Sequence, residues 1–164
     1  MEARFITPFI QSVQNVFSTM LQLPMQIGEP RVKAGKNTGY DVSGIIGMSG
    51  DVVGSVVLSF PDDAARRVVA LFAGEELSTD SPDFADAIGE LVNMVAGGAK
   101  ANFEGAKVSI SCPSVVVGSS HLIANTSDVP VIEIPCMTDC GEVAIQIAIK
   151  TNANAPTQAA SASA

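Results

Sequence analysis

Three segments of the chain carry apolar residues at intervals of three and four, which is the pattern of an amphipathic helix. They span residues 3–22, 61–74 and 81–103. Pro24 follows the first segment, and Gly74 closes the second in the manner of a helix C-terminus. The pattern therefore predicts two long helices and a shorter one between them.

Seven other segments are runs of β-branched and apolar residues bounded by turn residues, which predicts strands. They span residues 27–34, 40–48, 55–60, 108–111, 114–118, 129–137 and 141–150. Pro130 and Pro135 place an edge or a bulge in the sixth segment. A faint repeat relates 12–21 to 90–99 and 54–60 to 141–147, which would give two helix-plus-strands units sharing one sheet.

These elements predict an α+β domain over residues 1–150, with an antiparallel or mixed sheet and two long helices packed on one face. Residues 151–164 are small, polar and contain a proline, which is typical of a disordered tail. The whole chain has 164 residues, enough for one domain with its own core.

Composition narrows the function classes. Hydrophobic residues make up 47% of the chain and charged residues only 16%, which favours an oligomer that covers part of the surface. A net charge of −8 disfavours binding to nucleic acid. We expect a cytoplasmic protein, because the chain shows no membrane-spanning run, no signal peptide and only three cysteines.

The cysteines, the histidine and the common catalytic motifs give no candidate site. Cys112 and Cys136 lie in strand-like runs and are expected in the core, whereas Cys140 lies in a turn and could be exposed. The single histidine, His121, is expected in a loop or at a strand edge. The sequence has no His- or Cys-rich metal site, no phosphate loop followed by lysine, and no serine in a nucleophile elbow.

The segment 81–103 carries the strongest candidate site. Ser81 is placed to cap the helix. At about 100° per residue, one face of this helix is apolar. The opposite face carries a narrow polar stripe made of Asp86, Glu90, Asn93 and Gly97. Glu90 and Asn93 are three apart, so their side chains are neighbours.

Three glycines, Gly89, Gly97 and Gly98, lie on or near that stripe. Each costs about 1 kcal/mol against alanine in a helix interior. We therefore expect them to leave a bare surface from which Glu90 and Asn93 can enter a cleft of a partner. The alternatives are a solvated polar face, or glycines that serve only to pack another helix or chain.

The spacing Asp86-x3-Glu90-x2-Asn93, on a helix that precedes a strand hairpin, resembles the CheC/CheX/FliY phosphatases of bacterial chemotaxis. The opening "FITPFIQSVQNVFSTML" and the stretch "GIIGMSGDVVGSVVLSFP" are similar to the CheX branch. The likeness covers about residues 3–150. CheC-like members carry two such motifs, whereas here Ser12 replaces the first glutamate and only Asn15 remains.

The resemblance implies a phosphatase that hydrolyses the aspartyl phosphate of a CheY-type response regulator. Asn93 would orient the attacking water, Glu90 would dock the regulator, and Asp86 and Gly97 would belong to the docking surface. This chain would bind no metal, because the required Mg²⁺ would be held by the regulator.

The resemblance also implies a homodimer, for which 115–118 and 129–135 are the expected edge strands. Two other functions remain open at this point. One is a non-catalytic module that binds a receiver domain, and the other is a small-ligand sensor.

Overall fold

The structure is a computed structural model that describes residues 3–33, 39–124 and 128–155. Its three helices are α1 (Ala3–Leu21), α2 (Asp62–Ala73) and α3 (Pro82–Ala101). Its strands are β1 (Met25–Ile27), β2 (Arg31–Val32), β3 (Tyr40–Gly50), β4 (Val52–Phe60), β5 (Val108–Ile110), β6 (Ser114–His121), β7 (Ile132–Thr138) and β8 (Gly141–Thr151). No helix of the described ranges is long and apolar enough to cross a membrane.

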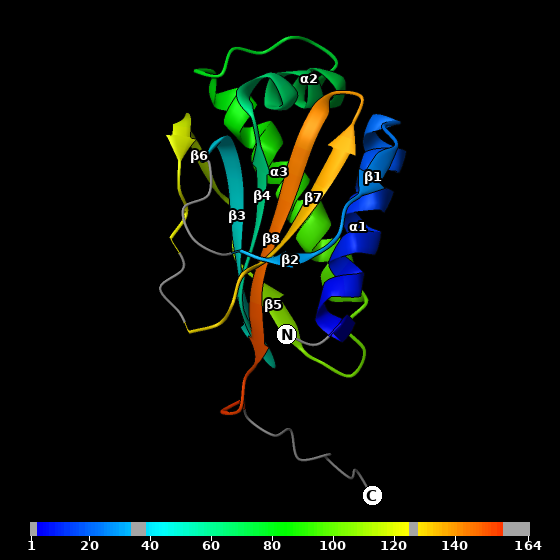
Figure 1. The fold of residues 1–164 in the computed structure, drawn as a ribbon, viewed down its shortest axis with the longest axis vertical. Helices are drawn as coiled ribbons and strands as arrows, with labels where there is room; N and C mark the ends of the chain where they lie inside the picture. Colours follow the sequence, from blue (N-terminus) through cyan, green and yellow to red (C-terminus); the bar gives the residue numbers. More distant parts are fainter. Residues whose placement is uncertain (1–2, 34–38, 125–127, 156–164) are drawn as a thin grey trace, which may run out of the picture.

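All the strands that the structure describes join one antiparallel sheet (Figure 1). Its order is β1-β7-β8-β4-β3-β5, with β2 beside β7 and β6 beside β3. The strand order has an internal symmetry. If β1, β3 and β4 are exchanged with β5, β7 and β8, the order reads the same from the opposite edge, and α1 then corresponds to α3. Two helix-plus-strands units that share one sheet would give this arrangement.

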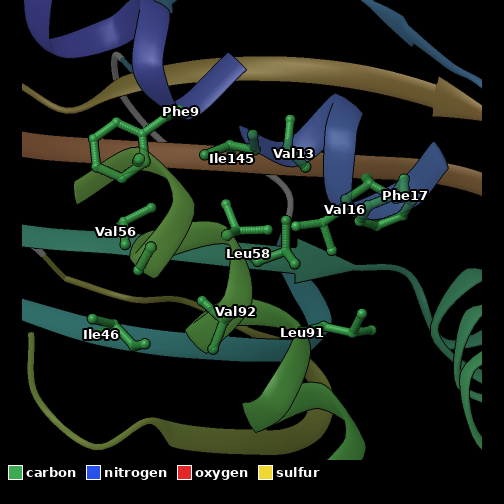
Figure 2. Packing of buried hydrophobic residues seen from close by; sticks show 14 of the residues in the cluster. Phe9, Val13, Val16, Phe17, Ile46, Val56, Leu58, Leu91, Val92 and Ile145 are labelled. Atoms are coloured by element: carbon green, nitrogen blue, oxygen red, sulfur yellow. The ribbon is translucent and has the colours of Figure 1, made fainter. Parts of the chain in front are cut away.

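The two long helices cover one face of the sheet, and α2 lies across the end of the sheet where α3 begins (Figure 1). The core between helices and sheet is aliphatic, apart from a few phenylalanines (Figure 2). Alternate residues of the central strands point into it because side chains alternate across a strand. The core residues labelled in Figure 2 are Phe9, Val13, Val16, Phe17, Ile46, Val56, Leu58, Leu91, Val92 and Ile145. The predicted α+β class and the helical layer are confirmed.

The face of the sheet opposite the helices carries several polar side chains that are buried. Ser43 and Ser59 share a hydrogen bond of 2.7 Å. Glu133, which is 2% exposed, accepts hydrogen bonds from Arg31 at 2.7 Å and from Gln146 at 3.1 Å. Both carboxylate oxygens of Glu133 therefore have a partner, as a buried charge requires.

The ends of the helices follow the predicted signals. The Ser81 hydroxyl accepts a hydrogen bond from the Asp83 N–H at 3.2 Å and so caps α3. Gly74 ends α2 with a φ of 77°. Pro61 gives α2 no side-chain cap. Instead the Asp41 carboxylate accepts from the Ser120 and Asp62 N–H groups, and these bonds lower the pKa of Asp41.

The predicted strand 27–34 is interrupted. Ile27 pairs with Cys136, but Arg31 pairs with Glu133, so the strand beside β7 holds one residue more than β7 does over this stretch. Pro135 lies opposite the interruption, and its carbonyl accepts from the Gly28 N–H at 2.7 Å. The missing N–H of Pro135 points to the same side. A bulge therefore lies at this proline, but its extra residue is in the strand that pairs with β7, whereas the prediction placed the bulge in 129–137.

The prediction of an edge at 129–135 is wrong, because β7 lies between β8 on one side and β1 and β2 on the other. Two cysteine predictions are also wrong. Cys112 is exposed because the chain is irregular between β5 and β6. Cys140 is buried because α2 packs over its turn, where a Cβ on Gly141 would lie 3.1 Å from Ala64.

Other predictions fall partly outside the described residues. The predicted strand 27–34 does so at its last residue. In the predicted tail, Thr151 ends β8, and Asn152 bonds to the backbone of Gly50 and Asp51. Residues 156–164 are not described, so the disordered tail stays a prediction.

Candidate functional site

Helix α3 holds the predicted stripe on a rigid support. Its inner face is fully buried and faces the sheet and α1. The residues of that face with no exposed surface are Phe84, Ile88, Leu91, Val92, Val95, Ala96 and Ala99. Since nearly two turns on each side of Asn93 are anchored in this way, the backbone that carries the stripe is fixed.

The stripe lies on the accessible side of α3. Asp86 and Glu90 are exposed, and Asn93 and Gly97 are half-buried. None of these side chains has a hydrogen-bond or ion-pair partner within the described part of the chain. A carboxylate and an amide without internal partners, one helical turn apart, are free to contact another molecule.

The three glycines do not share one role, so the predicted bare surface is only partly correct. A Cβ on Gly89 would lie 3.2 Å from Pro113, so this glycine packs against the segment that leads into β6. A Cβ on Gly98 would collide with the Ser12 hydroxyl of α1. Only around Gly97 is there open space, with nothing within 4 Å.

The first helix does not carry a second site. Ser12 is 5% exposed, and its hydroxyl donates to the Val95 carbonyl at 2.7 Å. Asn15, three residues later, is exposed. A buried serine that fastens α1 to α3 leaves Asn15 without an acidic neighbour at the position of Glu90.

An open groove of about 440 Å³ lies beside the stripe, between the end of α2 and the beginning of α3. It is lined by Phe72, Ala73, Glu75, Leu77, Asp83, Asp86, Ala87 and Glu90. The sequence did not predict this groove, because half of its lining comes from α2 and the connection after it. The only sequence signal was the pair of acids shared with the stripe.

His121 is part of a structural network at the edge of the sheet. Its ring nitrogens bond to the Ser43 hydroxyl and to the Gly118 carbonyl, both at 2.7 Å. Because a carbonyl can only accept, Nδ1 donates to Gly118. Ser43 has no exposed surface, and the adjoining cavity measures about 10 Å³, too small for a substrate.

Within the described ranges, no cluster of three or more His, Cys, Asp or Glu side chains is arranged to hold a metal ion.

Comparison with known proteins assigns the family. Residues 42–137 match the family model described as chemotaxis phosphatase CheX. The CheY-P phosphatase CheX of Thermotoga maritima is 32% identical over 121 residues, which cover 72% of this chain and 78% of that protein. This chain belongs to the CheX family of chemotaxis phosphatases.

Solved structures agree with the CheX assignment. A CheC-like superfamily protein from a Shewanella species has a TM-score of 0.84 at 34% identity, covering 92% of this chain and 99% of that one. The fold is also that of CheX from Borrelia burgdorferi, solved as a complex of CheX, CheY, BeF₃ and Mg²⁺. That protein has a TM-score of 0.75 at 24% identity, covering 89% of this chain and 97% of its own.

Proposed function

We propose that this CheX-family protein hydrolyses the aspartyl phosphate of a CheY-type response regulator, with Asn93 orienting the attacking water. The family match and the Thermotoga maritima CheY-P phosphatase support the reaction. The observation that carries the assignment to residues is the Glu90–Asn93 pair. It lies on the accessible face of α3, and neither side chain has a partner among the residues of known placement.

This reaction depends more on the positioning of a water molecule than on a strong base. An acyl phosphate is already reactive, and its hydrolysis needs a water molecule in line with the leaving carboxylate. The oxygen of an asparagine amide can accept a hydrogen bond from that water, and its NH₂ group can donate one to a phosphoryl oxygen. Asn93 has a short side chain on a helix whose inner face is fully buried, which limits the motion of the amide.

Glu90 docks the regulator. Its carboxylate is exposed and suited to a charge-assisted bond with a lysine or arginine next to the phosphoryl group. Asp86, one turn earlier, adds negative charge to the same contact. Gly97, with open space around it, lets the surface of the regulator approach the backbone of α3.

The Mg²⁺ that this reaction requires belongs to the regulator in our proposal. The Borrelia burgdorferi CheX structure contains Mg²⁺ together with CheY and BeF₃. In this proposal the chain acts together with the regulator in the cytoplasm.

The protein is further proposed to be a homodimer joined through β6. Among the strands that the structure describes, β6 pairs only with β3, and its eight residues include no Asp, Glu, Lys or Arg. The opposite edge carries the short strands β1 and β2, with Pro24, Pro30 and Arg31 beside or within them. Natural sheets protect free edges with prolines, charges and short strands, so β6 is the edge that lacks protection.

The function is tested by the decay of a phosphorylated CheY-type regulator in the presence of Mg²⁺. The wild-type protein should accelerate phosphate release, and Asn93→Ala should lose at least about a hundredfold of that acceleration. The fold should be kept, because Asn93 makes no side-chain hydrogen bond to any residue that the structure describes. Asn15→Ala is the matched control, an exposed asparagine on the other long helix, and should be as active as wild type.

Variants of Glu90 distinguish a docking role from a stripe that is only solvated. Glu90→Ala should raise KM, and Glu90→Lys should raise it further through repulsion. Equal activity of wild type, Asn93→Ala and both Glu90 variants would contradict the proposed site. If wild type binds the phosphorylated regulator without accelerating decay, the chain is instead a non-catalytic receiver-binding module.

A further inference from the structure

The groove between α2 and α3 has an apolar floor. Phe72 and Leu77 are half-buried and pack against the core, and Ala87 is 7% exposed. The end of α2 and the residues after it form one wall, and the first turns of α3 form the other. The groove opens to solvent next to Glu90, so whatever occupies it lies beside the proposed site.

The rim of the groove is acidic and uncompensated. Glu75, Asp83, Asp86 and Glu90 contribute four carboxylates, and no lysine, arginine or histidine of the described ranges lines the groove. None of the four side chains has an ion-pair or hydrogen-bond partner within the described ranges. Arg66 on α2 is paired with Asp62 at 2.7 Å and does not line the groove.

An apolar floor beneath several carboxylates fits a long aliphatic cation. Lysine and arginine bury their methylene stems against apolar surface and keep the charged group at the polar rim. A hydrated metal ion would gain nothing from Phe72 and Leu77. A neutral apolar side chain would leave the four carboxylates without a counter-charge.

We propose that this groove binds a lysine or arginine side chain of the regulator, so that the docking surface extends from the α3 stripe to α2. The inference rests on the proposed function for the identity of the partner. Two observations support it: the groove shares Asp86 and Glu90 with the stripe, and its charge is complementary to a basic side chain. The α3 stripe positions the water, and the groove sets the affinity.

The charge of the rim is tested with two neighbouring glutamates. Glu75 lines the groove and Glu76 does not, although both are exposed in the same connection. The probe is a CheY-type regulator from the same genome, activated with beryllium fluoride and Mg²⁺ and titrated with full-length protein. Glu75→Lys should weaken binding roughly tenfold at low salt, and Glu76→Lys should bind like wild type.

Salt and kinetics sharpen this test. Wild-type affinity should fall as salt rises, and the fall should be smaller for Glu75→Lys. In the phosphate-release assay, Glu75→Lys should raise KM and leave kcat unchanged. Binding by Glu75→Lys equal to that of Glu76→Lys would overturn the role of the rim.

The apolar floor is tested by filling the groove. Ala73 is exposed and lines the groove, so Ala73→Phe adds a ring there without disturbing the core. It should weaken binding, whereas Ala101→Phe, exposed at the far end of α3, should not. If both variants bind like wild type, the groove does not receive a side chain.

The groove inference and the proposed hydrolytic function can be disproved separately. If the wild-type protein does not accelerate dephosphorylation, but Glu75→Lys and Ala73→Phe still weaken binding, the groove stands and the hydrolytic function is lost. If Asn93→Ala abolishes activity while both groove variants bind normally, the hydrolytic function stands and the groove inference is wrong.

Discussion

The three cysteines occupy different environments. Cys112 is exposed in the irregular segment between β5 and β6. Cys136 is 3% exposed, and burial raises the pKa of its thiol to about 11. Burial also raises the pKa of Cys140, although Arg67 partly opposes the shift. Since the thiolate is the reactive form, these environments predict an order of reactivity.

Labelling at pH 8 with a thiol reagent should modify Cys112 rapidly and Cys136 only after unfolding. With a pKa of about 11, roughly one Cys136 thiol in a thousand would be ionised at that pH. Mass spectrometry of the labelled peptides measures the order, and Cys112→Ser should remove the fast phase. Rapid labelling of Cys136 in the folded protein would contradict the buried position.

Ser12 explains why only one of the two long helices carries an acid–amide pair. Where the resemblance expects a glutamate on the first helix, a serine is buried against α3 and bonded to the Val95 carbonyl. A glutamate at this position would place a charge between two packed helices, which is costly. The same contact that removes a second acid–amide pair therefore fastens the helix that carries the first one.

Helix α3 combines four environments in twenty residues. Its inner face packs on the sheet, Gly89 meets Pro113, and Gly98 meets Ser12. The outer face is left to the stripe. Of the three glycines, only Gly97 lacks a structural reason within the described chain, because a side chain there would meet nothing within 4 Å.

Gly97→Ala should therefore stabilise the isolated protein by up to about 1 kcal/mol and yet lower phosphatase activity, because the added methyl group obstructs the regulator. Chemical denaturation measures the first effect and phosphate release the second. Gly98→Ala is the control for packing, since it should lose the stabilisation by displacing Ser12. Full activity in a stabilised Gly97→Ala variant would remove Gly97 from the docking surface.

At the scale of the whole molecule, the sheet has one protected and one unprotected edge. The edge with β1 and β2 is short and interrupted at Gly28 to Pro30. The other edge, β6, is uncharged and exposes 43% of Val117. Pairing of two β6 strands would extend the sheet across two subunits and satisfy the free backbone groups.

Size-exclusion chromatography with light scattering should give the mass of a dimer at micromolar concentration. Val117→Lys places a charge on the β6 edge and should give a monomer. Val32→Lys is the matched control, a 60% exposed valine on β2, and should remain dimeric. A wild-type monomer would contradict the dimer, and a dimeric Val117→Lys variant would exclude β6 as its interface.

Most of the candidate site could be predicted from the sequence because it lies on a single helix. Asp86, Glu90, Asn93 and Gly97 share a face through helical geometry alone, whatever packs behind them. The groove could not be predicted, because Phe72 and Glu75 meet Asp83 only when α2 folds against α3. Its residues are separated in the chain by a connection with no regular pattern.

The sequence by itself determined the end of α2, the start of α3 and the stripe on α3. These depend on contacts within a few residues, such as the Ser81 cap and the left-handed Gly74. Only the tertiary structure decided which surfaces are covered: Cys140 lies under α2, and Gly89 and Gly98 pack on distant segments. Burial depends on which elements distant in the sequence pack together, and this cannot be read from the periodicity of a single segment.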